Sequence, residues 1–162
     1  MTRPANKNLS IYLNDHLAGS TLGVDLAKRI ADQNEGTELG AFMSGIAQEV
    51  DEDRDELKRL MDDLQVDQDR VKMTMAWLSE KAARLKLNGQ LLGYAPASPV
   101  VELESMSLGI EGKRRLWVAL QQVAQEYGLP QERLVALEER ARRQREGVEE
   151  HREEMARRAF SE

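Results

Sequence analysis

Residues 98–127 read SPVVELESMSLGIEGKRRLWVALQQVAQEY, a segment with the periodicity of an amphipathic helix. Ser98 is a residue type that caps helices, and Pro99 suits a first turn because its missing N–H would have no partner there. Apolar side chains then recur at steps of three and four, as in helices that pack against other helices. One step of this apolar stripe is charged, at Lys113. We therefore expect a helix whose inner face carries a lysine in need of a partner.

The composition of the chain indicates one helical domain. Its 162 residues are 41% hydrophobic and 32% charged, which is typical of a single helical unit with a real core. The net charge of −6 argues against a general nucleic-acid binder. The absence of cysteine excludes disulfides, thiolate metal sites and cysteine nucleophiles. No apolar run reaches the ~20 residues of a membrane span, and the N-terminus lacks a signal-peptide pattern, so we expect a cytoplasmic protein without membrane partners.

Two helices are expected before residue 67. The first covers about residues 8–34, and Gly36 is placed to end it in a left-handed turn. Thr37 can cap the second helix, which continues to about Val66. The inner stripe of this second helix is apolar at almost every step but is charged at Asp53. Asp53 is therefore the natural counterpart of Lys113.

Gly19 and Gly23 lie inside the first predicted helix, where each costs about 1 kcal/mol relative to alanine. Two interpretations explain this cost. The glycines either allow a close helix–helix contact or leave room for a ligand, and we favour the close contact.

Three further helices are expected after residue 66. The third begins at Asp67 or Asp69 and ends at Asn88-Gly89, followed by an apolar loop over residues 88–97. The fourth is the segment over residues 98–127. The fifth follows Pro130 and covers about residues 130–160, with a thin apolar stripe that predicts a peripheral position. The chain is thus predicted to be all-α, a single antiparallel up-down bundle of about five helices over residues 1–162.

The polar residues of the predicted inner faces fall at similar heights along the bundle. A helix rises ~1.5 Å per residue, and alternating helix directions bring one set of side chains to one level. This set is a structural polar layer that consists of His16, Asp53, Glu80, Lys113 and Arg114. In the interpretation we favour, Asp53 pairs with Lys113 or Arg114 and sets the register of the helices.

The segments LNDHLAG (13–19), RLKLNGQLLGY (84–94) and LGIEGKRRLW (108–117) resemble those of bacterial ferritin-like helical-bundle proteins. The resemblance implies the fold but no activity. Ferritin-like proteins that bind two metal ions use carboxylates and two Glu-x-x-His pairs. This chain has no Glu-x-x-His, and it places Lys113 and Arg114 where they would repel a dication.

Two functions follow from these observations. The first is a non-catalytic ferritin-like bundle without a cofactor, which acts by surface interaction or self-association, with no identified protein partner. The alternative is a carboxylate-bridged di-metal protein, an oxidase or a metal store for iron or manganese. Its candidate metal ligands would be His16, Glu49, Asp53, Glu80 and Glu111. No nucleophile elbow or phosphate-binding loop is present, so no catalytic residue is assigned.

A homodimer is expected from apolar residues that fall outside the inner stripes. These residues are Ile11, Leu22, Leu108 and Leu116, on the first and fourth predicted helices. Several exposed leucines on neighbouring helices can form a patch that suits a symmetric partner.

Overall fold

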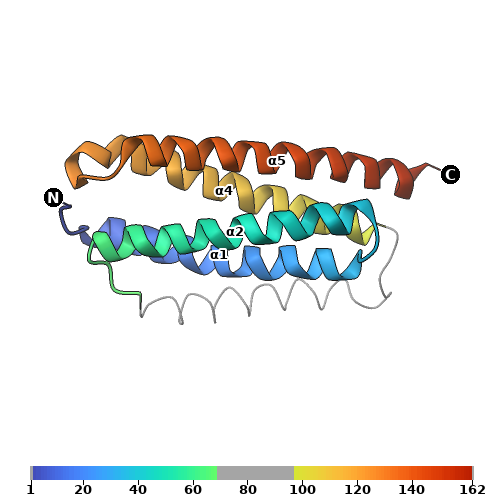
Figure 1. Cartoon of the computed structure of the whole chain (residues 1–162), viewed down its shortest axis with the longest axis horizontal. Coiled ribbons are helices and arrows are strands. Elements are labelled where there is room, and N and C mark those ends of the chain that lie inside the picture. The colour runs from blue at the N-terminus through green and yellow to red at the C-terminus, as the bar shows by residue number, and fades with distance from the viewer. Residues whose placement is uncertain (1, 69–96, 162) are drawn as a thin grey trace.

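The computed structural model describes residues 2–68 and 97–161, and it contains helices and no strands within these residues. Four helices are present there: α1 (Lys7–Gln33), α2 (Glu38–Asp63), α4 (Ser98–Tyr127) and α5 (Gln131–Phe160) (Figure 1). The helix expected between residues 67 and 89 lies almost entirely outside the described residues, so a fifth helix stays a prediction. The all-α class is confirmed for the described part of the chain.

Local sequence signals explain where the first two helices begin and end. Asn6 caps α1, since its side-chain oxygen accepts the Leu9 N–H at 2.9 Å. Thr37 caps α2 as expected, and its hydroxyl accepts the Gly40 N–H at 3.1 Å. Between the two helices Gly36 has the left-handed φ of 79° that the sequence predicts. The observed bounds therefore lie within three residues of the expected ones.

The start of α4 differs in detail from the expectation. Ser98 is already helical, and Ala97 precedes the helix without a side-chain capping bond. The N-cap position is therefore taken by Ala97 and not by Ser98, and Pro99 lies in the first turn as predicted. At the other end Gly128 adopts a φ of 68° and terminates α4 as predicted.

The helices form two antiparallel hairpins that pack side by side (Figure 1). One hairpin is α1 with α2, and the other is α4 with α5. The pairing of α1 with α4 is marked at one end by a bond of 3.1 Å from the Arg3 N–H to the Tyr127 carbonyl oxygen. Towards the other end, an ion pair of 3.4 Å joins Arg29 and Glu102. On the opposite side α2 faces α5, so polar residues of these two helices can meet.

The core is formed by the apolar stripes that the periodicity predicts. Its largest fully buried side chains come from all four described helices, among them Leu13, Met43, Leu57, Trp117 and Leu134. Helix α5 packs along α4 and buries five side chains: Leu134, Leu137, Ala141, Gln144 and Val148. Beyond Val148 the helix has no fully buried side chain, so its last turns are its most exposed part.

The expected outer apolar residues are only partly outside. Leu108 is 71% exposed and Ile11 is 37% exposed, whereas Leu22 is half-buried. Leu116 is 1% exposed, so its assignment to the outer surface is wrong. Within residues 2–68 and 97–161, no helix combines the length and the apolar character that crossing a membrane requires.

Candidate functional site: a buried polar layer

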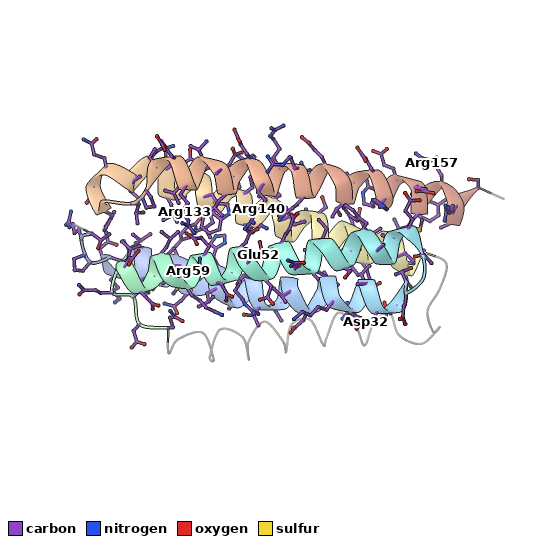
Figure 2. The ribbon with its side chains drawn as sticks, in the orientation of Figure 1. Asp32, Glu52, Arg59, Arg133, Arg140 and Arg157 are labelled. Carbon is purple, nitrogen blue, oxygen red and sulfur yellow. The ribbon has the colours of Figure 1, made fainter. Side chains whose placement is uncertain are left out.

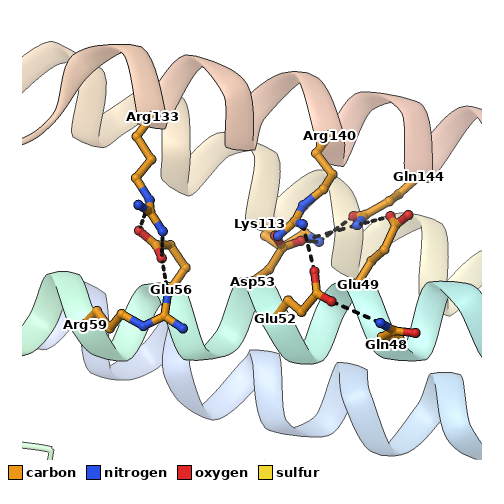
Figure 3. Close-up of polar contacts among 10 residues, drawn as sticks. All are labelled: Gln48, Glu49, Glu52, Asp53, Glu56, Arg59, Lys113, Arg133, Arg140 and Gln144. Atoms are coloured by element: carbon orange, nitrogen blue, oxygen red, sulfur yellow. Dashed lines mark hydrogen bonds and ion pairs between the residues drawn. The ribbon is translucent and has the colours of Figure 1, made fainter.

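A layer of polar side chains crosses the middle of the bundle (Figure 3). Asp53 enters it from α2 at a position between Val50 and Leu57 of the core stripe. Lys113 enters from α4, where its neighbours in the stripe are Ile110 and Trp117. Because a helix repeats its faces every three or four residues, each polar side chain points where its apolar neighbours point.

Asp53 is the centre of this layer and is 1% exposed. Lys113 Nζ donates to Asp53 Oδ2, and Arg140 donates from its guanidinium to Asp53 Oδ1. Both carboxylate oxygens therefore face cations from different helices, α4 and α5. Two hydrogen bonds from cationic donors offset the free-energy cost of removing this carboxylate from water.

Gln144 of α5 completes the layer and is 3% exposed. Its side-chain oxygen accepts from Lys113 Nζ at 2.5 Å. Its amide nitrogen lies 2.8 Å from a Glu49 carboxylate oxygen and 3.3 Å from Asp53 Oδ2. Arg140 also reaches Glu52, at 3.1 Å. Donors and acceptors of Asp53, Lys113 and Gln144 are thus paired with one another, whereas the buried Nε–H of Arg140 has no acceptor.

The pKa values of the two bases reflect this environment. Burial lowers the pKa of the Lys113 ammonium, although Asp53 beside it acts in the opposite direction. For Arg140, burial acts to lower the pKa, but the charge and the hydrogen bond of Asp53, together with the charges of Glu52 and Glu49, outweigh it and the pKa is raised. The two cations are therefore tied to Asp53, and removal of this one carboxylate would leave both without their main partner.

A second acid–base cluster lies next to the layer, between α2 and α5. Glu56 is 5% exposed and accepts from Arg59 at 2.7 Å and from Arg133 at 2.5 Å. Figure 2 shows Arg133 and Arg140 extending from α5 toward α2. Charge pairs therefore join the facing surfaces of α2 and α5, beside the stacked rings of Phe42 and His151, whose centroids lie 4.1 Å apart.

The other residues of the predicted layer are placed elsewhere. Arg114 points away from Asp53 and binds Glu111 at 2.9 Å and Glu138 at 2.6 Å. The hydrogen bond from Arg114 lowers the pKa of Glu111 to about 2. Glu111 is thus engaged by arginines and does not join Asp53. Glu80 lies outside the described residues.

His16 is half-buried on α1 and lies edge-on to Tyr12, with ring centroids 4.5 Å apart. Burial lowers the pKa of His16, against the opposing influence of Asp15. His16, Asp53 and Lys113 all border one cavity between α1, α2 and α4. His16 therefore lies near the polar layer, across the cavity that it shares with Asp53 and Lys113.

Sequence reasoning missed Arg140 as a member of the layer. The signal was present, since Gln144 interrupts the stripe of the fifth helix and Arg140 precedes it by one turn. Because the fifth helix was predicted to be peripheral, its residues were not considered when the heights of polar side chains along the bundle were compared. The contacts of Gln144 and Arg140 with Asp53 bring α5 into the layer.

Glycines of α1 and α4 border the same cavity. A Cβ atom built at Gly19 or Gly23 would meet no described atom within 4 Å. The close helix contact that we favoured for these glycines is therefore not found with the described helices. Gly109 and Gly112 of α4 border the cavity from the other side.

The possible metal ligands do not gather in the described part of the chain. Over residues 2–68 and 97–161, no group of three or more histidine, aspartate or glutamate side chains has the arrangement needed to hold a metal ion. No protein-family model, curated protein or solved structure matches the chain.

Proposed function

We propose that this chain is a non-catalytic, ferritin-like helical bundle that acts through its surface or by self-association. The observation that supports this proposal most directly is that Asp53 forms ion pairs with both Lys113 and Arg140. A di-metal centre in a helical bundle needs unpaired carboxylates at this level. Here the level holds two cations, which would repel a divalent ion.

The other acidic candidates support the same interpretation. Glu49 accepts from Gln144, and Glu111 is bound by Arg114 and Arg115. A metal ion would have to displace these donors before it could be coordinated. Charge-assisted hydrogen bonds of this kind are among the stronger ones in proteins, so this displacement is unfavourable.

An exposed apolar strip on α4 supports the self-association part of the proposal. Val101 is 58% exposed and Leu108 is 71% exposed. Because the two residues are seven apart on one helix, they lie on the same face, two turns from each other. A second copy of the chain could cover this strip by a symmetric contact.

Metal analysis of the purified protein tests the proposal. The protein is expressed with iron, manganese and zinc in the medium and dialysed. Its metal content is then measured by inductively coupled plasma mass spectrometry. We expect less than one metal ion per chain. One or two tightly held ions per chain would instead support the carboxylate-bridged alternative, an oxidase or a metal store.

A matched variant makes the result specific to the polar layer. Lys113→Met removes one of the two cations from Asp53 and leaves Arg140 in place. If the cations are what exclude metal, this variant gains affinity for Mn²⁺ relative to the natural chain. Arg114→Met is the control, because Arg114 contacts Glu111 and Glu138 but not Asp53.

A further inference from the structure

A cavity of about 390 Å³ lies between α1, α2 and α4, beside the polar layer. Apolar side chains from two helices form much of its wall, including Leu57 of α2 and Ile110 and Leu116 of α4. Cavities of this size and character are typical of sites for small organic molecules. Neither the core packing nor the polar layer accounts for its presence.

Four glycines keep the cavity open: Gly19, Gly23, Gly109 and Gly112. At each of them a Cβ atom would meet no atom of the described residues within 4 Å. The described helices therefore do not require glycine for close packing. Larger residues at these positions would extend into the cavity and reduce its volume.

Trp117 supplies an independent indication that the cavity has an occupant. Its side chain is 1% exposed and borders the cavity, and its indole Nε1–H has no acceptor. Buried indole N–H groups are normally hydrogen-bonded, so this donor is available to a ligand. A ligand that binds here should therefore present an acceptor.

Two further donors border the cavity. The Nε–H of Arg54 is buried and has no acceptor, because the contact of Arg54 with Asp51 uses another nitrogen. Lys113 has three N–H groups, and the described residues provide two acceptors, Asp53 and Gln144. Both groups carry a positive charge, so they favour an anionic acceptor over a neutral one.

We propose that this cavity binds a monocarboxylic acid with an apolar body. The carboxylate accepts from Lys113, Arg54 or the Trp117 indole, and the apolar body fills the glycine-lined space between α1 and α4. Asp53 does not oppose an anion strongly, because Lys113 and Arg140 already hold both of its oxygens. A cationic ligand is disfavoured in the buried part of the wall, since the buried unpartnered groups there, Trp117 Nε1 and Arg54 Nε, are donors; the carboxylate of Asp15, which also borders the cavity, is exposed to solvent.

Calorimetric titration with decanoate tests this proposal. We expect saturable binding of one decanoate per chain to the full-length protein. Decylamine, which has the same apolar body and the opposite charge, should bind at least tenfold more weakly. Absence of saturable decanoate binding would overturn the proposal, and so would equal affinity for decylamine.

Variants of the cavity locate the binding site. Gly109→Leu places a side chain into the cavity and should abolish decanoate binding. Gly45→Leu is the matched control, because Gly45 is exposed on α2, does not border the cavity and has no described atom near its Cβ position. Trp117→Phe retains the aromatic ring but removes the N–H, and should weaken binding about tenfold.

Circular dichroism of each variant establishes that it is folded before the titration. If Gly109→Leu does not fold, Gly23→Leu fills the same cavity from α1 and takes its place. Unchanged decanoate affinity in a folded cavity-filling variant would overturn the assignment of the ligand to this cavity. This result is independent of the metal analysis, so the two proposals can fail separately.

Discussion

Asp53 is a buried carboxylate that joins three of the described helices. It is buried, it bridges α2 to both α4 and α5, and its two partners differ in exposure. Lys113 is 13% exposed at its side chain and Arg140 is 27% exposed. Loss of Asp53 would leave two cations with weaker partners, whereas loss of Lys113 leaves Asp53 bound to Arg140.

The Asp53–Lys113 pair can be tested by a double-mutant cycle with Asp53→Leu and Lys113→Met. Asp53→Leu should reduce the free energy of unfolding by about 3–5 kcal/mol, because a buried charge loses its partner. Lys113→Met should cost less, since Arg140 remains on Asp53. The two changes together should show a coupling of about 1–3 kcal/mol by urea denaturation.

Arg114→Met is the control for this cycle. Arg114 lies one residue from Lys113, but its partners Glu111 and Glu138 are partly exposed. Loss of a pair of this kind should cost about 1 kcal/mol or less. Strict additivity of Asp53→Leu and Lys113→Met would contradict the bond between these two residues.

The lowered pKa of His16 predicts that the stability of the protein depends on pH near neutrality. Its pKa in the folded protein is lowered from 6.5, mainly by burial and against the effect of Asp15. As the pH falls below about 6.5, the unfolded chain takes up a proton at His16 while the folded chain resists it. The contribution of His16 therefore makes the folded state less stable as the pH falls.

The measurement is the urea midpoint at pH 7.0 and at pH 5.5. The natural chain should lose stability between these values, and His16→Gln should lose distinctly less. An equal loss in both proteins would show that His16 is not the titrating group. This window lies above the range in which Glu111, with a pKa of about 2, takes up its proton.

At the scale of elements, the turn between α1 and α2 depends on a close backbone contact. A Cβ atom at Gly40 would lie 2.1 Å from the Asn34 carbonyl oxygen, a distance that no relaxed contact allows. Gly40 also donates its N–H to the capping hydroxyl of Thr37. The first turn of α2 can thus pack directly against the end of α1 because Gly40 has no side chain.

Alanine substitutions at two glycines of α2 should have opposite effects. Gly40→Ala should destabilise the protein by at least about 2 kcal/mol, because the backbone of the turn must move to admit the methyl group. Gly45→Ala should stabilise it by about 0.5–1 kcal/mol, since Gly45 is exposed and its Cβ position is open. Thermal denaturation of both variants measures the difference, and a neutral Gly40→Ala would contradict the contact.

At the scale of the molecule, the two hairpins are joined by different interactions on their two sides. On one side α1 packs against α4, and the cavity lies at this junction with α2. On the other side α2 and α5 are linked by Asp53, Glu56 and their basic partners. Charged groups therefore contribute to the contact between α2 and α5, in addition to the apolar core that the four described helices share.

The exposed strip on α4 predicts the oligomeric state. Light scattering at micromolar concentration should give about twice the mass of one 18.4 kDa chain. Leu108→Glu should shift the protein toward the monomer, because a charge would enter the symmetric contact. Val135→Glu is the control, since Val135 is also exposed but lies near the start of α5, at the opposite end of the α4–α5 hairpin from this strip. A natural chain with the mass of a monomer would contradict the self-association.

The amino-acid sequence by itself determined the positions and ends of the four described helices. Caps such as Thr37 and left-handed glycines such as Gly36 act within a few residues, so local chemistry is sufficient to predict them. It also marked Asp53 and Lys113 as polar residues on inner faces, because helical periodicity is a local property.

Only the tertiary structure decided which side chains meet. Lys113 and Arg114 are neighbours in sequence, yet one reaches Asp53 and the other turns to Glu138. A rotation of ~100° per residue separates their directions, and the orientation of α4 against its neighbours selects between them. The cavity and the entry of Arg140 into the layer likewise depend on how whole helices pack, which no local pattern specifies.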